Sequence, residues 1–320
     1  MKSLPSFTFA LIALAITGYG ISGAALLGFQ ADPPKGGKSE TGKGPIAPSP
    51  NSANSNELPT DAPGAESLEA KAVLDQVRQR LRSYGTIKAK LIETVAMGNR
   101  RFTVSGGYLQ GANFKLRLDY QMKIGGTEGS VLEVCDGQVL WTRHQIGTET
   151  RVTRRDVRQI LQAAAEGGFP DNFVNVELGF GGLPGLFASI EKSIQFDQLK
   201  EDTQDGRKVL IIEGGWRAEM LTLWKANNPK APLPDYVPTR IRLFLDGNSF
   251  FPRRILYLGR NTEGSLRPMV SLDFSEIETN IAIPADKFKY SPPDGVFPED
   301  QTQQFLEQIR NRRQPKKSGE

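Results

Sequence analysis

Apolar and polar residues alternate along much of the chain between Gly85 and Phe274. The longest run covers seven residues from Phe114 to Tyr120, and shorter runs occupy 87–91, 102–104 and 270–274. Successive side chains of a β-strand point to opposite faces of a sheet, so each run predicts a strand with one apolar and one solvated face. The pattern predicts a mainly β protein.

Three Asp-Gly pairs lie between such runs, at Asp136-Gly137, Asp205-Gly206 and Asp246-Gly247. Asp-Gly supplies the positive φ angles that a tight hairpin turn requires. The sequence therefore predicts three hairpins in an antiparallel, meandering sheet: 131–135 with 139–143, 194–201 with 208–213, and 240–245 with 253–259.

Helical spacing occurs in a few shorter segments. Ser67 is a candidate N-cap, Leu74, Val77, Leu81 and Tyr84 recur on one helical face, and Gly85 ends the pattern. Further helices are expected over 156–165, 186–193 and, more briefly, 218–225. About three modest helices must cover a sheet of about ten strands. The concave face is then either filled by side chains or left partly open as an apolar cavity, and such a cavity suits a lipid chain, because each buried methylene contributes about 0.8 kcal/mol.

The two ends of the chain differ from this middle part. Residues 7–29 carry no charge and follow Lys2, so 1–31 are expected to be either a cleaved signal peptide, with a small-residue site at Ser22-Gly23-Ala24, or an N-terminal membrane anchor that contacts the bilayer through 7–29. Residues 32–66 form a Pro/Gly/Ser-rich linker that cannot bury a core and is expected to be disordered. Residues 299–320 are expected to be a basic, disordered tail. The protein is therefore expected to be exported.

The residues that commonly carry catalysis are scarce. Cys135 is the only cysteine and His144 the only histidine of the sequence. The chain therefore cannot form an intramolecular disulfide, a Cys-rich zinc site or a His-rich metal site. Cys135 and His144 could act as a nucleophile and its base only with each other, and the sequence shows no oxyanion site for such a pair. The net charge of +4 is spread along the chain without a basic stripe interleaved with aromatics. We expect a protein that is not an enzyme, has no cofactor or metal, and does not bind nucleic acid.

Four motifs, in this order and spacing, are similar to those of the LolA-like bacterial lipoprotein carriers. They are Arg-Ser-Tyr-Gly-Thr-Ile-Lys-Ala at 82–89, Lys-Leu-Arg-Leu-Asp-Tyr at 115–120, Asp-Gly-Gln-Val-Leu-Trp at 136–141, and Ile-Pro-Ala-Asp-Lys-Phe-Lys-Tyr-Ser-Pro-Pro-Asp-Gly-Val at 283–296. The resemblance spans 67–298 and implies an α+β fold in which a curved antiparallel sheet forms a half-open barrel with about three lid or flanking helices.

The resemblance also implies a function. It is that of a non-catalytic periplasmic carrier, which holds the acyl chains of lipoproteins or other lipids on the way to the outer membrane. The candidate cavity residues are Phe114, Leu116, Leu118, Tyr120, Leu140 and Trp141.

One departure from the carrier pattern concerns the lid. Carriers have Arg-Pro before the central strand, where the arginine gates the cavity, whereas this chain has Ala112 and Asn113. The linker and the additional residues between Trp141 and Arg240 also differ. An alternative is therefore a membrane-anchored envelope sensor or protein-interaction module that uses the same fold to bind an envelope protein, as sigma-factor regulator relatives do.

Overall fold

A computed structural model describes residues 64–97, 100–124, 126–169, 182–227, 237–261 and 263–313. Its strands form one sheet in the order β12-β6-β5-β4-β3-β2-β1-β11-β10-β9-β8-β7. Every pair of neighbours is antiparallel except β12 with β6. The strands are β1 (Thr86–Met97), β2 (Arg100–Gly111), β3 (Lys115–Ile124), β4 (Thr127–Asp136), β5 (Val139–Ile146), β6 (Glu149–Asp156), β7 (Ile194–Gln204), β8 (Arg207–Trp216), β9 (Arg240–Asp246), β10 (Pro252–Arg260), β11 (Leu266–Thr279) and β12 (Glu299–Asp300).

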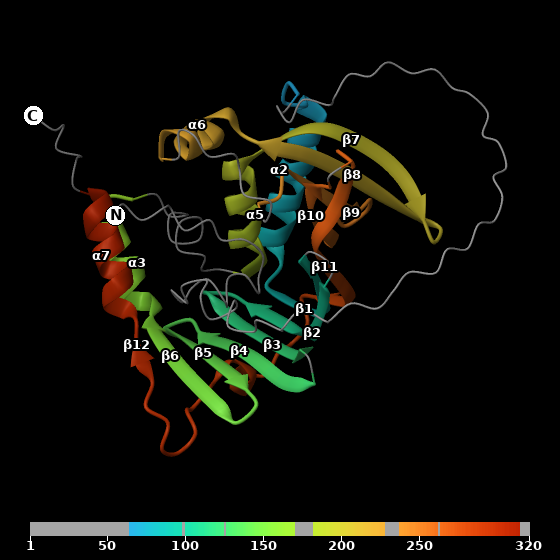
Figure 1. Cartoon of the computed structure of the whole chain (residues 1–320). Helices are drawn as coiled ribbons and strands as arrows, with labels where there is room; N and C mark the ends of the chain where they lie inside the picture. Colours follow the sequence, from blue (N-terminus) through green and yellow to red (C-terminus); the bar gives the residue numbers. More distant parts are fainter. Residues whose placement is uncertain are drawn as a thin grey trace, which may run out of the picture.

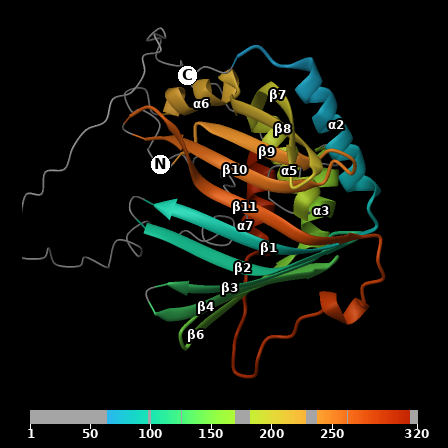
Figure 2. The ribbon, with the colours of Figure 1, turned by 90° about the vertical axis from the view of Figure 1, so that its right-hand side faces the viewer.

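The sheet is strongly curved and does not close into a barrel, because β12 and β7 lie at its two ends (Figures 1 and 2). Helices α2 (Leu68–Ser83) and α5 (Gly182–Ser193) lie side by side against the concave side, and α3 (Val157–Glu166) and α7 (Thr302–Arg313) lie together near β6 (Figure 1). The remaining helices in the described part of the chain are α6 (Ala218–Asn227) and the short 3-10 helix η1 (Ala285–Phe288). This arrangement confirms the predicted α+β fold with an open, curved antiparallel sheet.

The three predicted hairpins are present as β4–β5, β7–β8 and β9–β10. The β7–β8 turn follows the predicted geometry, since both Asp205 and Gly206 have positive φ, 50° and 72°. The β9–β10 turn does not. It is longer, its positive φ is at Phe250 (57°), and the Asp246 carboxylate accepts backbone hydrogen bonds from Asn248 and Ser249. The Asp side chain rather than the Asp-Gly pair organises this loop.

The predicted helices are also confirmed. Ser67 caps α2, because its side-chain Oγ accepts a hydrogen bond from the backbone N–H of Ala70. Asp156 caps α3 in the same way through the N–H of Gln159. Both caps satisfy helix N–H groups that have no intrahelical partner.

The prediction of a disordered tail over 299–320 is wrong for residues 299–313. Glu299 and Asp300 pair with β6 as β12, and α7 then packs against α3. The Thr302 hydroxyl accepts a hydrogen bond from the N–H of Asp156 at 2.9 Å, and Ile309 is buried. Thr302, Phe305 and Ile309 recur at helical spacing, so α7 has an apolar face in spite of its basic residues. Residues 314–320 lie outside the described part of the chain.

The expectations for the N-terminal region fall mostly outside the described residues, which begin at Gly64. The segments 1–31 and 32–63 are therefore not described. At the end of the expected linker, the N–H of Gly64 donates to Asp197 and the N–H of Ser67 donates to the carbonyl of Phe196 on β7. Among the described helices, none is both long and apolar enough to cross a membrane.

Candidate functional site

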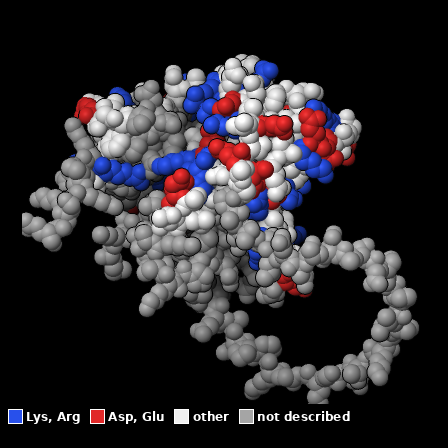
Figure 3. Space-filling model, turned by 90° about the horizontal axis from the view of Figure 1, so that it is seen from above, with Lys and Arg blue, Asp and Glu red and all other residues white. Residues whose placement is uncertain are grey.

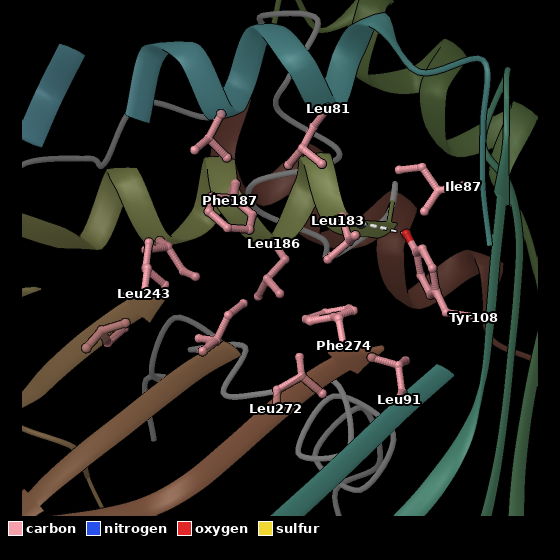
Figure 4. Close-up of a cluster of buried hydrophobic side chains, with 14 of the residues drawn as sticks. Leu81, Ile87, Leu91, Tyr108, Leu183, Leu186, Phe187, Leu243, Leu272 and Phe274 are labelled. Atoms are coloured by element: carbon pink, nitrogen blue, oxygen red, sulfur yellow. Dashed lines mark hydrogen bonds between the residues drawn. The ribbon is translucent and has the colours of Figure 1, made fainter. Parts of the chain in front are cut away.

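The α2–α5 side of the concave face is filled by side chains. Leu183, Leu186 and Phe187 of α5 lie between α2 and the strands, and all are buried (Figure 4). The Tyr108 hydroxyl accepts a hydrogen bond from the N–H of Leu183 at 2.8 Å, which joins the start of α5 to β2. This part of the apolar face is core.

Four of the predicted cavity residues share the concave face. The strand register sets Leu116 opposite Cys135 and Cys135 opposite Leu140, and directly opposed residues point to the same side. Leu118 and Tyr120 follow Leu116 at two-residue spacing on β3 and are fully buried, while Leu116 is 9% exposed. The alternation of β3 thus has the predicted orientation, and contact of these residues with a ligand remains a prediction.

Phe114 and Trp141 lie elsewhere. The sequence pattern starts the central strand at Phe114, but β3 begins at Lys115, and Asn113 and Phe114 have φ values of 57° and 62° because the chain turns there. Trp141 follows Leu140 directly and therefore points to the opposite, convex face. Its ring lies 5.9 Å from that of Tyr290, so it packs under the segment that crosses the convex side and is not brought together with the other candidates.

A hollow of about 430 Å³ opens where α2 ends, at the edge of the concave side. We call it the mouth hollow. It is lined by residues 81–85 at the end of α2, by 110–116 around the β2–β3 turn, and by Pro184 near the start of α5. Phe114 and Leu116 are among these residues, as is Ala112, the position at which the carriers have their arginine. Its volume lies in the range of small-molecule sites, and its walls combine apolar side chains with a few polar ones.

Two acidic groups on the concave face, one buried and one half-buried, were not predicted. Glu93 is fully buried on β1, and Glu133 lies on β4 opposite Leu118 and Thr142. Burial raises the pKa of the Glu133 carboxyl above its usual value. Both carboxyls lie near Tyr120, whose pKa is raised mainly by burial and further by these two charges. The sequence carries a signal for them in the alternation of its strands. Each acidic residue occupies a position whose side chain points inward, between apolar residues that point the same way.

The structure does not bring Cys135 and His144 together. His144 is paired with Val131, four residues from Cys135 along β4 and hence about 13 Å away. Burial raises the pKa of the Cys135 thiol to about 11, which keeps it in the unreactive protonated form. This geometry excludes them as a catalytic pair. Among the described residues, no cluster of His, Cys, Asp and Glu could hold a metal ion.

The surface charges of the described residues are mixed. On the face shown in Figure 3, Lys and Arg side chains lie among Asp and Glu side chains. Exposed ion pairs such as Lys88–Glu278 and Lys90–Glu276 join neighbouring strands on the convex face. Pairs of this kind contribute little to stability.

His144 gives a pH prediction. Burial, with the charges of Arg155 and Arg151, lowers its pKa from 6.5 to about 4. Between these values the unfolded chain binds a proton that the folded chain does not, so stability falls as the pH drops from 6.5 towards 4, by up to about 3 kcal/mol. Urea unfolding of the wild type and of His144→Gln at several pH values should show that the variant gains stability relative to the wild type over this window. A constant difference between the two proteins would contradict the prediction.

Searches of protein-family models and of curated protein sequences find no match to this chain. Among solved structures, the chain is similar to LprF from Mycobacterium bovis, with 12% identity and a TM-score of 0.38 over 69% of this chain and 98% of that one. It is also similar to a putative outer membrane lipoprotein-sorting protein domain from Vibrio parahaemolyticus (12% identity, TM-score 0.31, 68% of this chain and 97% of that one). A third similar structure is MucB in the Pseudomonas aeruginosa MucA/MucB complex, with 12% identity and a TM-score of 0.34 over 70% of this chain. The chain spans about 61% of the length of that MucB-containing match. The fold of the described residues, an open antiparallel half-barrel covered by helices, is the one that the four LolA-like motifs imply.

Proposed function

We propose that this protein is a non-catalytic, exported lipid-binding protein that holds acyl chains in the mouth hollow. The observation that supports it is the hollow itself, which opens at the end of the half-barrel between helices α2 and α5 and the β2–β3 turn. Leu81, Tyr84, Phe114, Leu116 and Pro184 supply its apolar walls. An acyl chain in contact with these groups would leave water, and this burial drives binding. The wider role, delivery of lipoproteins or other lipids towards the outer membrane, is part of the proposal and rests on the sequence motifs.

The test is the binding of a fluorescent long-chain fatty acid to the wild type and to Phe114→Asn. Asparagine tolerates the positive φ of this position, so the substitution removes the aromatic ring without new backbone strain. Loss of part of the buried apolar area should weaken binding about five- to tenfold.

The matched control is Phe297→Asn, because Phe297 is 92% exposed and lies outside the hollow. Affinity should be unchanged in this control. If the fatty acid does not bind the wild type, or if both variants bind like the wild type, the mouth hollow is not the acyl site.

A second candidate function is binding of an envelope protein. The observation that favours it is the end position of β7 in the sheet. From Gln198 onward, the described residues provide β7 with a partner on one side only, so its other edge offers backbone groups to an added strand. Native mass spectrometry of the protein purified from its host's envelope separates the two: a retained acyl lipid supports the first function, and a lipid-free complex with a protein supports the second.

A further inference from the structure

A second hollow of about 410 Å³ lies along the groove between α2 and α5. We call it the helix groove. Leu74 and Ala188 lie within it, together with charged residues of both helices and of the segments next to them. At the other end of the same helix pair, Leu81 and Pro184 line the mouth hollow. The end of α2 therefore lies near the start of α5, and the two helices run antiparallel.

Arg82 lines both hollows. It follows Leu81, which is buried against the core, and its own side chain is exposed. The helix groove and the mouth hollow therefore meet at Arg82. A ligand with its apolar part in the mouth hollow would have its polar end beside Arg82.

The charges in this region are arranged to receive an anion. Among the described residues, the lining of the mouth hollow includes Arg82 and Lys115 and no acidic residue. Lys115 directly precedes the inward Leu116 on β3, so its side chain points to the convex face and Arg82 is the cation on the side of the hollow. In the helix groove the acidic groups already have partners: Arg78 pairs with Asp75 and Glu191, and Arg217 pairs with Glu66 at 3.0 Å. Arg82 forms no ion pair with a residue that the structure describes. Arg82 is thus available where the two hollows meet.

We propose that the acyl ligand is anionic, with its charged head group bound by Arg82 and its chain in the mouth hollow. This inference rests on the proposed acyl-binding function and adds the class of head group. A guanidinium donates paired hydrogen bonds to a carboxylate or a phosphate, so the shared chemistry is an oxyanion at the head of an acyl chain. The two sources are the carboxylate of a free fatty acid and the phosphate of a phospholipid.

The experiment compares three ligands of equal chain length below their micelle-forming concentrations. Palmitate carries a carboxylate, palmitoyl lysophosphatidylglycerol carries a phosphate, and monopalmitoylglycerol carries no charge. Displacement of the fluorescent fatty acid from the wild-type full chain gives the three affinities. The variant is Arg82→Gln, and the matched control is Arg80→Gln, which lies on the same helix and lines neither hollow.

We expect at least one anionic ligand to bind the wild type about tenfold more tightly than monopalmitoylglycerol, and Arg82→Gln to remove most of this difference. Arg80→Gln should leave it unchanged. The advantage should also decline as salt is raised, since a partly exposed charge pair is screened. The anionic ligand whose affinity is lowered more by Arg82→Gln identifies the source as fatty acid or phospholipid.

The result that overturns the inference is equal affinity for the charged and uncharged ligands, or an advantage that survives Arg82→Gln. In either case the acyl-binding function itself would stand. If none of the three ligands displaces the probe and the probe itself does not bind, the proposed function fails first. Circular dichroism of each variant shows that it is folded, which is expected because both substituted side chains are exposed.

Discussion

Replacing Ile309 with aspartate should lower the free energy of unfolding by about 3–5 kcal/mol, since an uncompensated buried charge carries a penalty of this size. Ile309 is 2% exposed and belongs to the main hydrophobic cluster. Aspartate would remove its apolar contacts and would place an unpaired charge between α7 and the body of the domain. Urea denaturation followed by circular dichroism measures the change.

The neighbouring Arg310 provides the control. Its side chain is exposed, so Arg310→Ala should change stability by less than about 0.5 kcal/mol. Ile309→Ala should fall between the two, with a loss of about 2–4 kcal/mol from the cavity that it leaves. Equal stabilities of Ile309→Asp and the wild type would mean that α7 is not docked on α3 and β6.

The same helix shows where sequence reasoning fell short. The strands and hairpins could be predicted because alternation over many residues and Asp-Gly turns are local signals. The apolar stripe of α7 was also local, at Phe305, Leu306 and Ile309, but it is diluted by Gln and Arg. A stripe that weak folds only because α3 and β6 offer a surface to cover, and this surface depends on contacts between segments more than 140 residues apart, such as Asp156 with Thr302.

The candidate site, too, could be predicted only where the signal is local. Parity correctly placed Leu116, Leu118 and Tyr120 on one face, because pleating is a property of the strand alone. The same rule applied to Leu140 and Trp141 separates them, whereas the motif had joined them into one unit. The mouth hollow requires the end of α2, the β2–β3 turn and Pro184 to meet, and this meeting is a consequence of tertiary packing. The role of Arg82 is likewise visible only once α2 and α5 lie side by side.

A buried charge network holds the β7–β9 end of the sheet. The Arg240 side chain is 13% exposed and pairs with both Asp197 and Glu213, whose side chains are 6% and 9% exposed. Glu213 also pairs with Arg242 at 2.6 Å, and Asp197 accepts the N–H of Gly64 at 2.9 Å. The network thus connects three strands to the point at which the described chain begins.

Arg240→Leu should destabilise the protein by about 3–5 kcal/mol at neutral pH, because it leaves two buried carboxylates without their shared cation. The control is Arg254→Leu, which breaks a more exposed pair with Asp273 and should cost less than about 1 kcal/mol. Urea denaturation of both variants measures the two losses. A loss for Arg240→Leu no larger than that for Arg254→Leu would mean that Arg240 stabilises the sheet by packing alone.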